Sequence, residues 1–204
     1  MLLKNPLLAE LFGELDALAP MGYSLGLHIR FISAALFKTT YPDIWVRIYC
    51  GRAYYPRDPV VIWGIGTTGT CRWSEIPVPD PHGVFAQAAA HGLRFGAASA
   101  CGPVTSRSVV GIARADREFS DAELAQLTRI TRDLHKRAAP PAELSPAQLA
   151  ALRCLAQGDR NCEAAERLGI SESAFKARLT SARKHLSART TAEALRVAHD
   201  YCLL

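Results

Sequence analysis

The most constraining feature of this 204-residue sequence is a series of helix start and stop signals that begins at Ser145. Ser145 and Gln148 are spaced as a capping box, and Pro146 stands at the first helical position, where its missing N–H costs nothing. Leucines then recur at helical spacing until Gly158. This spacing predicts a first helix that buries one apolar face and ends at that glycine.

Three more helices are predicted after it. Residues 162–168 show a short helical pattern, and Gly169 supplies the left-handed residue that ends it sharply. Ser171 caps the next helix, which is expected to run to about Leu186 with an apolar back. A capping box at Thr190 begins the last helix. The C-terminal part of the chain is therefore predicted to be all-α.

A short helix, a glycine turn and a capped helix with a basic front make a helix-turn-helix arrangement, whose second member enters the major groove of DNA. Small side chains let its backbone approach base edges, while lysine and arginine neutralise phosphates. The alternative is a four-helix packing module with a solvated basic face. We predict a four-helix helix-turn-helix domain over residues 145–204. Its candidate DNA-binding residues are Ser173, Lys176, Ala177, Arg178, Thr180, Ser181, Arg183 and Lys184.

Residues 1–138 mix helical and alternating patterns. Helices are indicated at 5–18, at 81–92 and from the capping box at Ser120, and strands at 22–31, 94–102 and 106–115. Helices that bracket a sheet with short connections predict an α+β fold, a three-layer α/β/α sandwich with a central antiparallel sheet. Two prolines within residues 139–144 indicate a linker between the two domains.

Composition and cysteine spacing argue against several classes of protein. No apolar run approaches the roughly 20 residues that span a bilayer, and charges interrupt the first 18 positions, unlike a secretory signal. We therefore expect a cytoplasmic protein without a membrane partner. The six cysteines form no C-x-x-C pair, so no metal site, disulfide framework or cofactor is expected. The sequence has no nucleophile elbow or phosphate loop, and we expect no catalytic residues and no enzymatic activity.

The C-terminal sequence resembles the LuxR-type DNA-binding domain. The resemblance rests on the L-S-P opening at Leu144, the A-E-R-L-G-I-S run of residues 165–171 and the R-x-x-x-E-A motif that ends at Ala194. Gln148 and Ala164 depart from the pattern, which usually has an acidic residue and an isoleucine there. The resemblance implies a recognition helix over 172–186, a DNA-backbone contact by one lysine and a groove-facing surface. The residues so implied are Lys176, Thr180, Ser181 and Arg183.

The N-terminal part contains a second set of motifs. Tyr41, Trp45 and Tyr49 stand at i, i+4 and i+8, and so share one side of a helix if residues 43–54 are helical. The pattern Y-P-x-x-W-x-x-x-Y, then D-P-V-V from Asp58 and then Trp73, resembles the acyl-homoserine-lactone-binding domain of quorum-sensing LuxR regulators. The H-G-L-R-F-G stretch of residues 91–96 also matches that family.

The resemblance implies a small-molecule autoinducer, an N-acyl-homoserine lactone, held in an apolar pocket with a few polar groups. Trp45 would donate its indole N–H to the lactone carbonyl, Asp58 would accept from the amide N–H, and Tyr41 would donate to the amide carbonyl. The implied ligand-binding residues are Tyr41, Trp45, Tyr49, Asp58, Val60 and Trp73. The family often has a serine or threonine on the central strand, and this sequence has Ile112 or Ala113 near that place.

Each motif also has a structural interpretation. Aromatic residues at helical spacing are more often core than ligand contacts, and Asp58 before Pro59 is by itself a turn signal. Together, the motifs predict a ligand-responsive transcriptional regulator that binds double-stranded DNA as a homodimer. One alternative is an orphan LuxR-type regulator that acts without a lactone or with another small molecule. Another is an anti-activator that forms inactive heterodimers.

Overall fold

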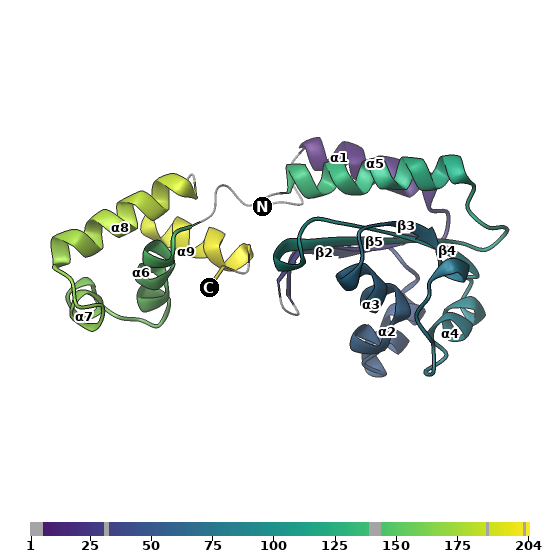
Figure 1. The fold of residues 1–204 in the computed structure, drawn as a ribbon, viewed down its shortest axis with the longest axis horizontal. Helices are drawn as coiled ribbons and strands as arrows, with labels where there is room; N and C mark the ends of the chain where they lie inside the picture. Colours follow the sequence, from purple (N-terminus) through teal and green to yellow (C-terminus); the bar gives the residue numbers. More distant parts are fainter. Residues whose placement is uncertain (1–5, 31–32, 139–143, 187, 202) are drawn as a thin grey trace. The chain divides into compact units, whose positions relative to one another are not determined.

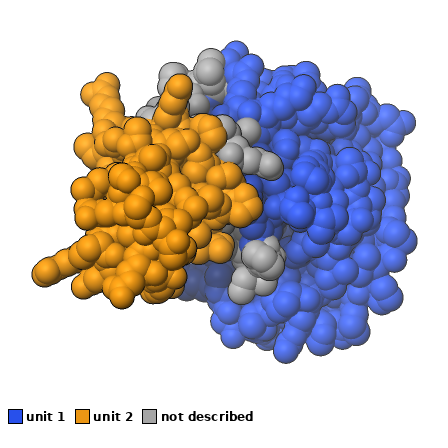
Figure 2. Space-filling model, turned by 60° about the vertical axis from the view of Figure 1, so that its left-hand side comes forward, with its two compact units in different colours: residues 1–139 blue, residues 140–204 orange. Residues whose placement is uncertain are grey.

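The computed structural model describes residues 6–30, 33–138, 144–186, 188–201 and 203–204. The chain divides into two compact units, residues 1–139 and residues 140–204. Figure 1 shows the fold of each unit, and Figure 2 colours the first unit blue and the second orange. The predicted linker, residues 139–144, lies outside the described residues except for its last position.

The described residues of the first unit form one antiparallel sheet of five strands in the order β2-β1-β5-β4-β3. Strand β3 at one edge has four residues, and each of the others has seven or eight. The strands are β1 Tyr23–Arg30, β2 Ser33–Thr39, β3 Gly69–Arg72, β4 Phe95–Cys101 and β5 Arg107–Arg114. The predicted antiparallel sheet is confirmed, because every neighbouring pair runs in opposite directions.

Helices cover both faces of this sheet, as Figure 1 shows. Two helices lie side by side on one face, α1 Pro6–Leu18 and α5 Asp121–Arg137. Three shorter helices lie on the other face, α2 Asp43–Gly51, α3 Pro59–Gly66 and α4 Val84–Ala90. The α1/α5 face holds a close-packed core, in which Leu15, Tyr23 and Leu127 have no exposed surface. The helix-bracketed sheet predicted from the sequence is therefore observed.

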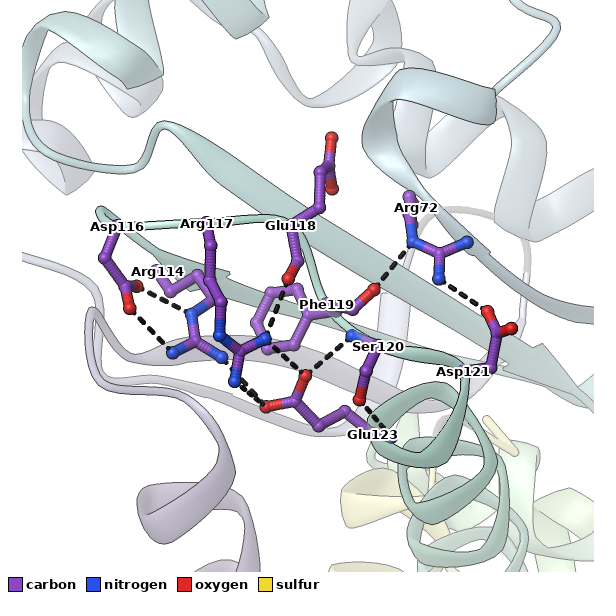
Figure 3. A network of polar contacts seen from close by, with 9 residues as sticks. All are labelled: Arg72, Arg114, Asp116, Arg117, Glu118, Phe119, Ser120, Asp121 and Glu123. Carbon is purple, nitrogen blue, oxygen red and sulfur yellow. Dashed lines mark hydrogen bonds and ion pairs between the residues drawn. The ribbon is translucent and has the colours of Figure 1, made fainter.

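The start of α5 is fixed by the polar network of Figure 3. Ser120 caps the helix and Glu123 closes the predicted capping box. The Glu123 carboxylate also accepts hydrogen bonds from Arg114 at the end of β5 and from Arg117. These hydrogen bonds to Arg117 and Ser120 lower the pKa of Glu123 to about 2, against the smaller effect of burial. From β3, Arg72 reaches across to the Asp121 carboxylate, 2.6 Å away.

In the described residues of the second unit, four helices surround an apolar core. Ser145, Ser171 and Thr190 each cap a helix through the side-chain oxygen, as predicted. Gly169 has the expected left-handed conformation, with φ +63°. Ala164, where the resemblance predicted missing bulk, is fully buried in the core. The helices are α6 Pro146–Ala156, α7 Asn161–Arg167, α8 Glu172–His185 and α9 Thr191–Asp200.

Among the described strands and α-helices, three were not predicted from the sequence. Strand β2 and the four-residue strand β3 form the two edges of the sheet. Helix α3 begins at Pro59, directly after Asp58, where a break was expected. Asp58 is in fact the N-cap of α3, because its carboxylate accepts the backbone N–H of Val60. An aspartate followed by proline is a recognised start signal for a helix, so this element was available to sequence reasoning.

Candidate functional site

A cavity of about 640 Å³ lies in the first unit, between the sheet and the helices α2, α3 and α4. Its size is within the range of small-molecule sites. The structure brings all six predicted ligand-binding residues to its wall: Tyr41, Trp45, Tyr49, Asp58, Val60 and Trp73. They come from different elements, so the cavity exists only in the folded unit. Their contacts with a ligand remain a prediction.

Aromatic side chains of α2 form one wall. Trp45 is buried, and its ring meets Tyr49 edge-on with centroids 5.7 Å apart. Tyr54, which follows the helix and was not singled out in the sequence, packs against both rings at 6.2 Å and 5.9 Å. No described residue forms a hydrogen bond with the Trp45 indole N–H. The i, i+4 arrangement therefore produces a rigid aromatic wall that retains one free donor.

Asp58 is the acidic group of the cavity, and it connects two helices. Its Oδ1 accepts the Val60 backbone N–H at 2.8 Å, and its Oδ2 accepts the Tyr49 hydroxyl at 2.7 Å. Burial raises the pKa of Asp58, while the hydrogen bonds from Tyr49 and Val60 act in the opposite direction. Each carboxylate oxygen has two lone pairs, so the group has room for one more donor from a ligand.

Tyr41 brings its hydroxyl to the sheet side of the same region. Burial, and then the nearby Asp58 charge, raise the pKa of Tyr41 well above its usual range. The phenol is therefore a neutral donor at physiological pH. Its hydroxyl has no hydrogen-bond partner among the described residues. Together with Trp45 and Asp58, Tyr41 contributes two donors and one acceptor, the polar complement of an amide next to a carbonyl group. Trp73 Nε1, also on the wall, is buried and has no partner among the described residues.

Trp73 lies on a third side of the cavity, stacked on Phe85 of α4 with centroids 5.4 Å apart. Gly96 of β4 makes this position possible, because a Cβ there would lie 2.0 Å from the Trp73 ring. Gly96, the last residue of the H-G-L-R-F-G motif, therefore has a steric role. It admits the indole ring against the sheet.

Strand β5 presents no hydroxyl group to the floor of the cavity at residues 111–113. Ile112 points to the opposite face of the sheet, in the α1/α5 core, and Ala113 packs with Trp45 outside the cavity wall. The residue of β5 that lines the cavity at this level is Gly111. Neither of the two positions considered in the sequence, Ile112 and Ala113, lines the cavity. Alternation along the strand places Gly111, rather than Ile112, on the cavity side.

The rest of the wall is mostly apolar, with Val46, Val61, Val84 and Ala88 from the three helices. Phe37 of the edge strand β2 is 61% exposed and also lines the cavity. Within the described parts of the chain, no group of three or more metal-ligating side chains occurs. No described helix is long and apolar enough to cross a membrane. The mostly apolar wall of the cavity, with its few polar groups, suits a ligand that has an apolar chain and one small polar head.

The predicted DNA-binding residues lie along α8 in the second unit. Six of the eight residues are exposed, whereas Arg178 and Arg183 are half-buried. Lys176 forms an ion pair with Glu172 at 2.6 Å, one turn earlier. Lys184 is exposed in the last turn. The exposed residues are Ser173, Lys176, Ala177, Thr180, Ser181 and Lys184.

Ser181 has an internal partner that the sequence did not indicate. The buried Gln148 of α6 donates from Nε2 to the Ser181 hydroxyl at 2.8 Å. Gln148 Oε1 accepts the Ser145 N–H of the capping box and also lies 3.2 Å from His185 Nδ1. Gln148, which stands where the resembled family has an acid, thus joins α6 to α8. The Ser181 hydroxyl is already engaged in this contact.

Residues 26–138 match the protein family described as "Autoinducer binding domain". Over 181 residues the chain is 32% identical to the transcriptional activator protein RaiR of Rhizobium etli. That alignment covers 80% of this chain and 75% of RaiR. RaiR is a transcriptional activator protein, in agreement with the sequence-based expectation of a regulator without enzymatic activity.

Solved structures show the same fold. SdiA in complex with octanoyl-rac-glycerol is similar with a TM-score of 0.57 and 22% identity, over 98% of this chain and 91% of that chain. A crystal structure of Escherichia coli SdiA gives a TM-score of 0.55 at 21% identity, over 99% and 94%. The N-acylhomoserine lactone-dependent LuxR family factor CepR2 of Burkholderia cenocepacia gives 0.51 at 18%, over 67% and 85%.

Proposed function

Because this chain belongs to the LuxR-type family that carries the autoinducer-binding domain, we propose that it binds an N-acyl-homoserine lactone and regulates transcription through DNA binding. The observation that carries this proposal is the 640 Å³ cavity, where an indole donor, a phenol donor and a buried carboxylate meet an otherwise apolar wall. The family itself supports a ligand-responsive transcriptional regulator; the lactone, the DNA and the dimer belong to the proposal.

The lactone would be held at its head group. Trp45 donates to the ring carbonyl, Asp58 accepts from the amide N–H and Tyr41 donates to the amide carbonyl. The acyl chain lies along the apolar wall, and Val60 and Trp73 pack against the ligand. Each polar atom of the head then has a partner of matching character, which a buried polar group requires.

Ligand binding stabilises the first unit by mass action. A ligand at one hundred times its dissociation constant adds about 2.7 kcal/mol to the free energy of unfolding. The stabilised protein forms a homodimer through α5 and neighbouring surfaces, and two C-terminal units address a dyad-symmetric DNA site. In each C-terminal unit, α7, the turn at Gly169 and α8 act as a helix-turn-helix, with α8 as the recognition helix.

Thermal unfolding of the purified full chain tests the ligand. We expect N-octanoyl-homoserine lactone to raise the melting temperature in a concentration-dependent manner, and octanoate, which lacks the amide and the lactone, to leave it unchanged. 1-Octanoyl-glycerol is the third arm, because SdiA is known in complex with octanoyl-rac-glycerol. If only the glycerol ester raises the melting temperature, the ligand is an acyl compound other than the lactone. No shift with any of them would contradict the proposed ligand binding.

A gel-shift assay with the purified protein tests the DNA part. We expect retardation of a dyad-symmetric DNA fragment selected from a random pool, and stronger retardation with the lactone present. Selection of no sequence above background would contradict a DNA-binding homodimer and favour the heterodimerising anti-activator. Sedimentation of the same sample, with and without lactone, reports the oligomeric state directly.

A further inference from the structure

One row of residues crosses the floor of the cavity on three neighbouring strands. Ser24 of β1 pairs with Thr39 of β2 on one side and with Gly111 of β5 on the other. Residues directly opposite each other in an antiparallel pair project their side chains from the same face of the sheet. All three line the cavity. The row therefore presents two hydroxyl groups and one bare backbone position to the ligand space.

The two hydroxyl groups are not equally available. Thr39 uses its hydroxyl within the protein, because it donates to the Tyr23 carbonyl at 3.2 Å and accepts the Tyr41 backbone N–H at 3.3 Å. Ser24 is half-buried, and its hydroxyl forms no hydrogen bond with any described residue. A hydroxyl group on the wall of an apolar cavity needs a partner. Ser24 is thus the free hydroxyl of the floor.

Gly111 leaves open the space that this hydroxyl faces. A Cβ at position 111 would stand 3.3 Å from the Tyr41 hydroxyl and 3.9 Å from the Ser24 carbonyl oxygen. Opposite residues of an antiparallel pair have Cβ atoms roughly 5 Å apart. The hydroxyl groups of Ser24 and Tyr41 therefore border the same gap, and a single ligand oxygen placed in that gap has two donors.

We propose that Ser24 is a ligand-binding residue that donates, together with Tyr41, to the acyl carbonyl oxygen of the ligand. In this chain the sheet hydroxyl comes from β1, and Gly111 of β5 supplies the room for the carbonyl. The inference rests on the proposed function, since it concerns an acyl ligand in the same cavity. It makes the ligand class an acyl compound whose carbonyl accepts two hydrogen bonds.

Titration calorimetry with N-octanoyl-homoserine lactone tests the role of Ser24. Ser24→Ala should raise the dissociation constant about fivefold to tenfold, the effect of one lost hydrogen bond. Ser24→Thr keeps a hydroxyl group and a strand-compatible side chain, and should bind within about twofold of the wild type. Ser74→Ala is the matched control, because Ser74 is exposed and outside the cavity wall. Equal affinity of the Ser24→Ala variant and the wild type would overturn the proposal.

A second pair of variants tests whether a hydroxyl group at position 111 of β5 can replace the one at position 24 of β1. Ser24→Ala combined with Gly111→Ser should recover most of the lost affinity, whereas Ser24→Ala combined with Gly111→Ala adds the same Cβ without the oxygen and should not. Equal affinities of the two double variants would contradict the inference that hydroxyl groups at positions 24 and 111 reach the same ligand oxygen. If either double variant unfolds, the comparison of Ser24→Ala with Ser24→Thr still decides the proposal.

The two levels of the proposal fail differently. If the wild type binds no acyl ligand, the proposed function is wrong and the inference about Ser24 is wrong with it. If the wild type binds the lactone and Ser24→Ala binds it equally well, the function stands and the role of Ser24 alone is rejected.

Discussion

His28 and His135 stack their imidazole rings face to face with centroids 4.3 Å apart, which joins β1 to the last turn of α5. His28 Nε2 lies 2.8 Å from the His135 carbonyl, and Ser106 and Ser108 each lie 2.8 Å from one imidazole nitrogen. His28 Nε2 donates to that carbonyl, so the neutral ring has its other nitrogen free to accept from Ser106. The pair is therefore arranged for two uncharged rings.

We predict that acid weakens the first unit through this pair. Burial, the largest cause, holds the pKa of His28 at about 4, although its bond to the His135 carbonyl opposes this. The unfolded chain takes up the proton near pH 6.5, whereas the folded chain does so only near pH 4. The free energy of unfolding should therefore fall as the pH drops through this window, by on the order of 2 kcal/mol between pH 7 and pH 5.

Urea unfolding at the two pH values measures this difference. His28→Asn removes the titrating imidazole and its stacking contact, so the variant should be less stable at pH 7 and its stability should depend less on pH. Asparagine is chosen because it tolerates the left-handed backbone at this position, φ +51°. His82→Asn, at an exposed site, should behave as the wild type. A His28→Asn variant with the full wild-type pH dependence would show that another group is responsible.

Gly96→Ala should damage the cavity wall from the sheet side. The added Cβ would lie 2.0 Å from the Trp73 ring, so the ring or the strand must move. We expect a loss of about 1 to 3 kcal/mol in the free energy of unfolding and a weakened response to lactone. Gly66→Ala is the control, because nothing lies within 4 Å of its Cβ position. Equal stabilities for the two variants would refute the steric role of Gly96.

Asp58 variants should separate helix capping from ligand binding. Asp58→Ala removes the cap of α3 and should cost about 1 kcal/mol, whereas Asp58→Asn retains an oxygen that accepts the Val60 N–H. Both variants should lose the thermal shift with lactone, since neither keeps the carboxylate. Melting curves with and without ligand give both quantities. An unchanged dose-response in the Asn variant would exclude the carboxylate as the amide acceptor.

Lys184→Ala should weaken DNA binding with little dependence on sequence. Its exposed ammonium group is available to a phosphate, so its removal should reduce the slope of log affinity against log salt by about one. Arg153→Ala changes an exposed charge on α6 instead of α8 and should leave that slope unaltered. Fluorescence anisotropy over a salt series distinguishes the two. If both variants lower the slope equally, α8 is not the preferred phosphate-binding element.

Elements with local end signals could be predicted from the sequence. The capping boxes at Ser120 and Ser145 specify helix starts through contacts within four residues, so no tertiary information is needed. The edge strand β3 was missed because its hydrogen bonds come from a partner far along the chain. Cys71, for example, pairs with Ala98. A four-residue strand has too short a pattern to indicate itself.

The cavity was predictable in its walls and less so in its floor. Trp45 and Tyr49 lie four residues apart in α2, which fixes their common side, whereas Tyr41 precedes the helix, which ends at Gly51 rather than at residue 54. Gly111 and Ser24 are neighbours only through strand pairing, and that register is set by the whole sheet. An error of one position along β5 exchanges the two faces.

Adjacent residues at the end of β3 serve opposite faces of the sheet. Trp73 borders the cavity, while Arg72, one peptide bond earlier, holds the start of α5 through Asp121 and the Phe119 carbonyl. If a ligand displaces the indole ring together with its backbone, the displacement reaches the start of α5 through Arg72. Energetic coupling of this kind is reciprocal. A macromolecule that immobilises the first turn of α5 would in the same measure change how firmly the cavity retains its occupant.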